Sequence, residues 1–416
     1  MGVDDELLAA IYADLDNDQP RLVYADWLEE HGDVDRAAFI RAQCELARLP
    51  FWSAERGLLR NTIDQLYARN KRKWTRDLKG TKIREYEFRR GFLDHIVLNG
   101  RTSVPFAGKI FEAYPTVQSV KINALRPVFD ELLETPWLPQ VRRLNLINNS
   151  IGMKRTIALA ECDRLQHLTA LNLHSNKIGS RGMRAVMHSE SLRSLRHLVL
   201  CHDEIGAADD IAQLCGGRCG IGLESLVLVQ MGFERDSVDT LNQLFTAVDF
   251  PNLRYLNAAE NSFCARPASD ESLAPFLDTE NFRRLEHFVI DLLSGENLAR
   301  LSGHPHSANL RSLVYYAQNY AEHGGRREWA MSALALAQPP LWTSLEYAAL
   351  FVDRPDDGEL DFPLELLSKL KAIRLPSHRE LTSQLRDRGV AVLQGPLHDD
   401  WERLTEFAAT TFPASQ

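Results

Sequence analysis

Two cysteines lie in the glycine-rich segment CGGRCGIG, at Cys215 and Cys219. Closely spaced thiolates are typical ligands of structural zinc, which takes a tetrahedral set of ligands. The Cys-x3-Cys spacing is wider than the usual Cys-x2-Cys, and no second pair lies nearby. We therefore expect a small-residue loop that ends a helix at 207–214, and no metal site.

Two further groups of polar residues could support chemistry. His304 and His306 stand in the segment GHPH, and residues 202–204 read His-Asp-Glu. The first group has no companion cluster of carboxylates, and the second falls where a predicted strand gives way to a turn. The phosphate-loop, dinucleotide, zinc-protease and nucleophile-elbow motifs are all absent from the sequence. The sequence predicts no catalytic residue, no metal and no cofactor, and hence a protein that is not an enzyme.

Composition narrows the class of protein further. The 416 residues are 44% hydrophobic and 25% charged, which is the balance of a globular chain. A net charge of −9 argues against a general nucleic-acid coat protein. The six cysteines are sparse, the first residues are acidic rather than signal-like, and no run approaches about 18 apolar residues. We expect a cytoplasmic protein that does not contact a membrane.

The elements that would position any site are repeats of a short leucine pattern, L-x-x-L-x-L. Eleven copies begin between Leu93 and Leu370, so the mean period is about 28 residues. The copies begin at Leu93, Val117, Val141, Leu168, Leu195, Leu223, Leu253, Leu285, Leu310, Leu345 and Leu370. Their fourth and sixth positions are apolar and alternate with variable residues, as in a strand with one buried face.

An asparagine follows the sixth position by three residues at Asn149, Asn176 and Asn261. Its amide can bond backbone groups of neighbouring turns that would otherwise be unpaired. Segments of helical period separate the strands at 153–162, 181–188, 237–248, 326–336 and 379–388.

Residues 90–395 resemble leucine-rich repeats of the ribonuclease-inhibitor type. The resemblance implies an α/β solenoid shaped as a horseshoe, with a parallel sheet on its concave face and helices on its convex face. We expect one continuous parallel sheet from about Leu93 to Leu375.

The first 50 residues lack the leucine pattern and predict a small all-α module of three helices. Capping residues and apolar spacing place Trp27 and Phe39 in its core. The segment 20–49 resembles the bacterial repeat-companion domain, and YEFRRGF at 86–92 resembles the lead into that family's first repeat. The resemblance implies an architecture and supplies no catalytic residues.

The sign of the net charge changes from negative to positive after this module. Residues 1–50 hold 12 acidic and 4 basic side chains, whereas residues 51–90 hold 5 acidic and 12 basic ones. The basic segment could meet phosphates and stack a base on its tryptophan, or could be a solvated face that offsets the acidic module. Its candidate surface residues are Arg69, Lys71, Arg72, Lys73, Trp74 and Arg76.

The sequence therefore divides into four parts. Residues 1–50 form the helical module, 51–90 a basic connector or N-terminal cap, 91–395 the repeat solenoid of about 11 repeats, and 396–416 a C-terminal cap helix and tail. Trp401, Leu404 and Phe407 recur at helical spacing in the last part.

The concave face is the candidate functional surface. Its outward positions are polar in the first repeats and become apolar and aromatic in later ones, which is typical of a partner site. An insertion or the C-terminal tail could instead fold over part of this face. The predicted partner-binding residues are Tyr255, His287, Val289, Val314, Tyr316, Tyr347 and Phe351.

These features favour a bacterial, non-enzymatic scaffold that binds a protein partner on the concave face. One alternative is a regulator that wraps and occludes a partner enzyme. The other is association with nucleic acid through residues 69–90. The sequence leaves the identity of the partner and the oligomeric state open.

Overall fold

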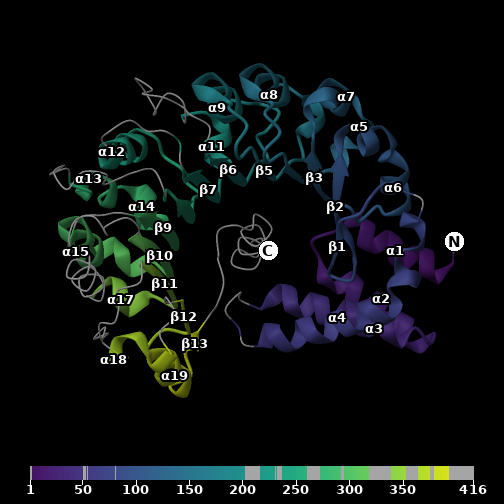
Figure 1. Ribbon diagram of the computed structural model, residues 1–416, viewed down its shortest axis with the longest axis horizontal. Helices are drawn as coiled ribbons and strands as arrows, with labels where there is room; N and C mark the ends of the chain where they lie inside the picture. The colour runs from purple at the N-terminus through teal and green to yellow at the C-terminus, as the bar shows by residue number, and fades with distance from the viewer. Residues whose placement is uncertain are drawn as a thin grey trace. The chain divides into compact units, whose positions relative to one another are not determined.

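The computed structural model describes residues 2–49, 53, 55–79, 81–201, 216–229, 231, 237–259, 272–291, 295–317, 339–352, 364–374 and 379–392. The chain forms two compact units. The first includes residues 1–149 and 164–170, and the second includes residues 150–163 and 171–397. Figure 1 shows strands lined by helices on one side in each unit.

Four helices open the chain: α1 (Val3–Ala13), α2 (Asp18–Glu30), α3 (Val34–Arg48) and α4 (Glu55–Trp74). The Asn17 side chain caps α2 by accepting a hydrogen bond from the backbone N–H of Gln19 at 2.9 Å. Asp33 is the N-cap residue of α3. The three helices predicted for residues 1–50 are therefore present, while the resemblance to a repeat-companion domain stays a prediction.

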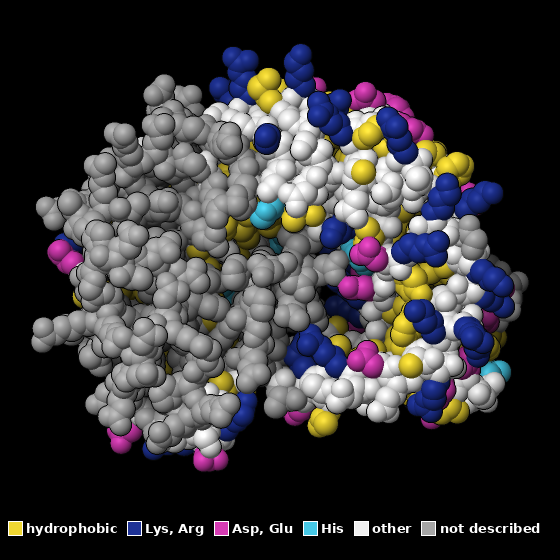
Figure 2. Space-filling model, in the orientation of Figure 1, with side chains coloured by type: hydrophobic (Ala, Val, Ile, Leu, Met, Phe, Trp, Pro, Cys, Tyr) yellow, Lys and Arg dark blue, Asp and Glu magenta, His cyan; other side chains and the backbone are white. Residues whose placement is uncertain are grey.

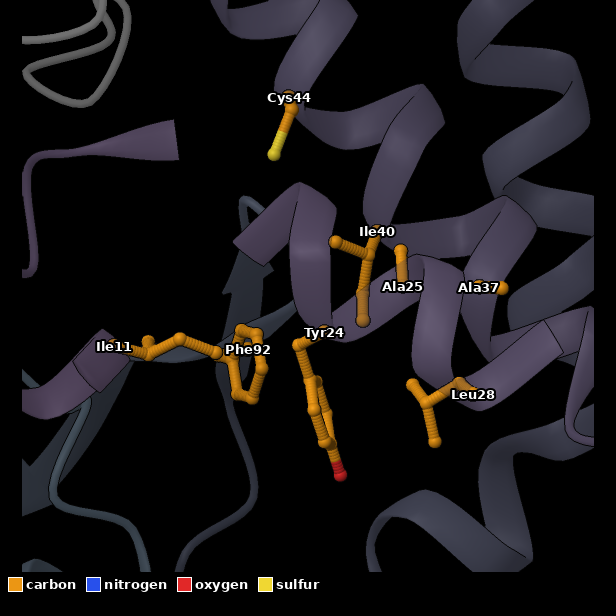
Figure 3. Packing of buried hydrophobic residues seen from close by; sticks show 8 residues of the cluster. All are labelled: Ile11, Tyr24, Ala25, Leu28, Ala37, Ile40, Cys44 and Phe92. Atoms are coloured by element: carbon orange, nitrogen blue, oxygen red, sulfur yellow. The ribbon is translucent and has the colours of Figure 1, made fainter. Parts of the chain in front are cut away.

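The core of the module differs from the prediction in one residue. Phe39 is buried, but Trp27 is only partly buried and stacks on Tyr24 at 5.9 Å between ring centroids. Tyr24 takes the central place and packs with residues from α1, α3 and a following strand (Figure 3). That cluster consists of Ile11, Tyr24, Ala25, Leu28, Ala37, Ile40, Cys44 and Phe92. Trp27 packs against this cluster but is only partly buried, so its expected full place in the core is wrong, and Phe92 from outside the module joins the core.

A β-hairpin connects the helices to the sheet. Its strands are β1 (Tyr86–Arg89) and β2 (Phe92–Asn99), which pair antiparallel. Gly91 has φ +87°, and a Cβ there would lie 2.3 Å from the side chain of Ile40, so only glycine fits this approach of the turn to α3. Gln43 of α3 donates to the carbonyl of Phe88 at 2.9 Å and accepts from the N–H of Gly91 at 2.8 Å.

The sheet contains thirteen strands within the described residues, in the order of the sequence. Strands β2 to β4 and β6 to β13 pair in parallel with their neighbours. The α/β repeat solenoid is confirmed, but the antiparallel β1 adds an edge strand that was not expected. The remaining strands are β3 (Ser119–Asn123), β4 (Arg143–Asn145), β5 (Ala170–Asn172), β6 (His197–Cys201), β7 (Ser225–Val229), β8 (Tyr255–Asn257), β9 (His287–Asp291), β10 (Ser312–Ala317), β11 (Tyr347–Val352), β12 (Ala372–Arg374) and β13 (Ala391–Val392).

The leucine pattern forms the core of the solenoid. In every copy the first and fourth positions are buried, and in the four clearest copies the sixth position is buried too. The side chains of Leu350 and residue 375, both sixth positions, lie outside the described residues. The predicted register is confirmed wherever the structure describes it.

Asparagines bridge successive repeats as predicted. The Asn149 amide donates to the carbonyls of Ile122 and Leu146 at 2.7 and 2.9 Å, and its oxygen accepts from the N–H of Leu125 at 2.7 Å. Asn176 is equally buried and donates to the carbonyl of Leu173 at 2.8 Å. Asn261 lies outside the described residues.

Later repeats are joined by an asparagine that the leucine pattern did not predict. Asn281 donates to the carbonyls of Phe245 and Val248 at 2.8 and 2.7 Å and accepts from the N–H of Phe250 at 2.8 Å. This bridge lies between helical segments instead of at strand ends, so its spacing in the sequence follows the helices.

The connections between strands contain full helices in some repeats and single turns in others. Four of the five predicted helices are present as α8 (Gly152–Ala160), α9 (Gly179–Met187), α12 (Ser237–Ala247) and α19 (Arg379–Asp387). The predicted helices at 207–214 and 326–336, and the cap residues Trp401, Leu404 and Phe407, lie outside the described residues. The other helices are α5 (Gly100–Ser103), α6 (Gly108–Ala113), α7 (Phe129–Glu134), α11 (Arg218–Gly222), α13 (Ala274–Leu277), α14 (Glu280–Arg284), α15 (Gly295–Gly303), α17 (Leu341–Ser344) and α18 (Leu364–Leu367), with 3-10 turns η1 (Arg76–Leu78), η2 (Val104–Phe106), η3 (Arg126–Val128), η4 (Leu138–Gln140), η5 (Asp163–Leu165) and η6 (Pro305–Asn309).

None of the helices that the structure describes has the length and apolar character needed to cross a bilayer. The division into parts 1–50, 51–90, 91–395 and 396–416 stays a prediction.

Candidate interaction surface

The residues that could have held a metal do not form a metal site in the described part of the chain. No group of three or more His, Cys, Asp or Glu side chains gathers there. Cys219 is buried, and burial raises the pKa of its thiol to about 12, which disfavours the thiolate. His304 faces the exposed Asp278 at 3.2 Å, and His306 bonds the carbonyl of Leu277 at 3.1 Å. Cys215 and residues 202–204 lie outside the described residues.

Five of the seven residues predicted to bind a partner are buried. We call the face of the sheet that was predicted to be concave the outer sheet face. The five buried residues lie on it, on strands β8 to β11. The exposed fraction is 8% or less for each of Tyr255, His287, Val289, Val314 and Tyr347. The expectation that they are solvent-facing anchors was therefore wrong.

The strand register places several of these residues side by side. Tyr255, His287, Ser312 and Tyr347 stand opposite one another on four neighbouring strands. Adjacent strands lie about 4.8 Å apart, so side chains at one register position are direct neighbours. His287 Nδ1 and Ser312 Oγ, for example, are 2.7 Å apart. Burial lowers the pKa of His287 to about 3, with a smaller effect from the charge of Arg311, so the ring is neutral.

Tyr316 and Phe351 stand opposite each other in the pairing of β10 with β11. Their side chains lie outside the described residues. Their role as anchors remains a prediction, and the register adds that the two positions are direct neighbours.

The outer sheet face is more exposed on the first strands, within the first unit. Asn99 and Asn123 are exposed, and Lys121 and Arg143 are half-buried. Arg143 donates to both carboxylate oxygens of Asp94 at 2.6 Å. Burial raises the pKa of Asp94, but the charges of Arg143 and Arg89 outweigh that effect and hold it below its usual value. This part of the face is polar, as the sequence predicted.

Part of the basic segment packs on the helical module. Ile63 and Leu66 of α4 pack with Phe39 and Ala42 of α3. Lys73 Nζ lies 2.7 Å from Asp33 Oδ2, so one of the predicted surface cations is paired within the chain. That pair supports the interpretation that the positive charge of this segment offsets the negative charge of the acidic module.

Trp74 is held inside an aromatic cluster and does not offer a free ring face. Its centroid lies 4.6 Å from that of Phe39, and the Arg36 guanidinium carbon lies 4.8 Å from the Trp74 ring. Burial lowers the pKa of Arg36 to about 10, a value at which it remains charged at neutral pH. Trp74 is half-buried among these contacts, and its stacking on a nucleic-acid base stays a prediction.

The other predicted cations of this segment remain exposed: Arg69, Lys71, Arg72 and Arg76. Figure 2 shows Lys and Arg side chains in this part of the molecule, interspersed with Asp and Glu. They form a charged surface without an accompanying aromatic platform.

Charged residues of alternating sign precede the strands of the second unit, and we did not predict them from the sequence. The residue directly before each strand from β6 to β12 is charged, and successive members alternate in sign. Neighbouring members form the ion pairs Arg196–Glu224 at 3.3 Å, Arg254–Glu286 at 3.6 Å, Glu286–Arg311 at 3.6 Å, Arg311–Glu346 at 2.9 Å and Glu346–Lys371 at 2.9 Å. We call these seven residues the charge ladder.

Comparison with solved structures finds similarity to the leucine-rich-repeat-containing protein LegL7 from Legionella pneumophila, at 17% sequence identity and a TM-score of 0.46. The match covers 77% of this chain and 99% of that chain. The sequence matches no model of a known protein family and no curated protein.

Proposed function

We propose that the chain is a non-enzymatic scaffold that binds a protein partner on the outer sheet face. The observation that supports this most directly is the pairing of β10 with β11, which places Tyr316 opposite Phe351. Two neighbouring aromatic residues make an efficient anchor, because such side chains bury much apolar area at low cost in conformational entropy. A cytoplasmic location fits the reduced-thiol composition and belongs to the same proposal.

The proposed contact is narrower than the sequence suggested. Tyr255, His287 and Tyr347 already lie within the packed face, so a partner cannot gain their full burial. The pair Tyr316 and Phe351 lies four register positions after the pair Ser312 and Tyr347, and strand alternation assigns both pairs to the same face. The partner's main contact should therefore lie toward the C-terminal ends of β10 and β11.

The test is the affinity of a purified partner for the variant Tyr316→Ala/Phe351→Ala. Truncation of an aromatic anchor typically costs about 2 kcal/mol or more, so we expect at least a roughly thirtyfold loss of affinity with an unchanged melting temperature. A partner can be obtained by photo-crosslinking from position 316, with the exposed position 126 on the helical side as the matched control.

The basic helix provides the competing outcome. Arg69→Glu/Arg72→Glu removes two exposed cations and leaves the Lys73–Asp33 pair in place. If the aromatic variant binds normally and only this charge reversal fails, the outer-face proposal is wrong.

Nucleic-acid association stays a second candidate because Arg69, Lys71, Arg72 and Arg76 are exposed together. Its signature would be binding that falls steeply as salt increases. A regulator that occludes an enzyme would instead show loss of that enzyme's activity on binding, through the same outer face.

A further inference from the structure

The four N-terminal helices of the first unit pack one on the next, in a row. α1 packs on α2, α2 on α3, and α3 on α4. α1 and α4 are therefore the outer members of the row, and each presents one helix face that no described neighbour covers. The two faces carry opposite charge.

The face of α4 is basic. Leu58, Gln65, Arg69 and Arg72 recur at spacings of seven, four and three residues, which places them on one side of the helix, and all four are exposed. Leu58 has 73% of its surface exposed, which is high for a leucine on a helix. Among the described residues, neither Arg69 nor Arg72 forms an ion pair. We call this set the basic stripe.

The face of α1 is small and acidic. Ile11 is its one buried residue within the described helix, whereas Ala9, Ala10 and Ala13 are exposed. Asp14 and Asp16 follow directly at its C-terminal end, and both are exposed. We call Ala9, Ala10, Ala13, Asp14 and Asp16 the acidic face.

The ion pairs within the module involve other carboxylates than those of Asp14 and Asp16. Asp18 pairs with Arg48 at 3.0 Å, Asp26 with Arg41 at 2.6 Å, and Asp33 with Lys73 at 2.7 Å. Asp14 and Asp16 form no ion pair with any residue in the described ranges. Arg90 pairs with Asp18 at 3.3 Å and donates to the backbone carbonyl of Asp16, so the carboxylates of Asp14 and Asp16 remain for an external partner.

We propose that the basic stripe of one copy binds the acidic face of a second copy, head to tail. The charges are complementary, and exposed alanines let a neighbouring helix approach closely. α1 and α4 do not pack on each other as the consecutive helices do, so the stripe and the face are separate surfaces of the module. The contact adds the helix row of one copy to that of the next.

The arrangement has two measurable consequences. A head-to-tail contact uses different surfaces on the two copies, so it builds rings or open filaments instead of an isologous dimer, and the average mass rises beyond that of a dimer with concentration. Exposed charges are screened by salt over roughly 10 Å at about 0.1 M, so association should weaken strongly as salt increases.

The experiment is sedimentation velocity of the full chain up to about 0.3 mM, where contacts worth roughly 4–5 kcal/mol populate oligomers. We expect oligomers at about 0.02 M NaCl that dissociate at about 0.5 M. Variants Asp14→Lys/Asp16→Lys and Arg69→Glu/Arg72→Glu should each be monomeric alone. An equimolar mixture should associate again, because the reversed face of one matches the reversed stripe of the other.

The control for Asp14→Lys/Asp16→Lys is Glu112→Lys/Glu131→Lys, which makes the same change of net charge at exposed positions elsewhere in the first unit. It should associate like the unaltered chain. Circular dichroism and melting temperature establish that each variant is folded. A monomeric wild type at low salt, a mass that stops at a dimer, or a mixture that stays monomeric would each overturn the proposal. Binding of nucleic acid or of another acidic protein to the stripe, without self-association, would assign the stripe to that partner instead.

Discussion

Replacing Asn149 by leucine tests how the repeats are held together. The Asn149 side chain donates to the carbonyls of Ile122 and Leu146 and accepts from the N–H of Leu125, all at 2.7–2.9 Å. Leucine has a similar volume and no polar atom. The substitution therefore removes the partner of these backbone groups in a site where the asparagine is 5% exposed.

The magnitude follows from the number of groups left without a partner. A buried donor or acceptor that loses its only partner costs about 1–3 kcal/mol. Leu125 N–H loses its acceptor, and at least one of the two carbonyls loses its donor. We therefore expect a loss of about 3–5 kcal/mol, a large share of the roughly 5–15 kcal/mol that stabilises a typical domain.

The assay is urea unfolding followed by circular dichroism, with Asn123→Leu as the matched control. Asn123 is exposed and makes no side-chain hydrogen bond to the described residues, so its replacement should change stability by no more than about 0.5 kcal/mol. Hydrogen exchange at the Leu125 amide should accelerate in the Asn149 variant alone. If Asn149→Leu lies within about 1 kcal/mol of the wild type, the bridging amide does not hold the repeats together.

Three further outcomes follow from buried and paired ionisable groups. Burial lowers the pKa of His287 to about 3 against about 6.5 when unfolded, so stability should fall as pH drops from about 6.5 toward 3, and His287→Gln should flatten that slope in melts across pH. Partial burial raises the pKa of Glu346, but hydrogen bonds from the flanking lysine and arginine outweigh the effect of burial and lower the pKa. The stabilisation that the ionised Glu346 provides is therefore present above about pH 4.3 and is lost below it. Glu346→Gln should lower the melting temperature at neutral pH and not in acid. Burial raises the pKa of the Cys44 thiol to about 12, so alkylation measured by mass spectrometry should be slower at Cys44 than at the half-buried Cys162, and equal rates would contradict this.

The core of the solenoid could be predicted because its signal is local. Alternation of period two identifies the buried side of each strand from a few residues, and Leu171, Leu198 and Leu226 follow it without exception. The bridging role of Asn149 and Asn176 could be predicted for a similar reason, since their offset from the strand is fixed. Asn281 could not, because its partners are set by how two helical segments pack.

The accessibility of the outer sheet face could not be predicted from one strand at a time. Tyr347 is buried although its register neighbours on β10 and β12 are the small residues Ser312 and Ala372, so its burial cannot be derived from its own strand or from the strands beside it. The helical module also has a core that its own letters do not complete. Phe92, which contacts Tyr24, arrives from the hairpin after α4.

The charge ladder was present in the sequence but visible only when the repeats are aligned. It occupies the second position of seven consecutive leucine patterns, and the letters there read Arg, Glu, Arg, Glu, Arg, Glu, Lys. Each exposed pair contributes little by itself, about 0–1 kcal/mol. The alternation has a larger effect on specificity, because a strand that paired with its second neighbour would place like charges side by side. Every correct pairing opposes unlike charges, and every pairing that skips one repeat opposes like charges. We conclude that this position acts against mispairing among strands whose buried leucines are nearly interchangeable.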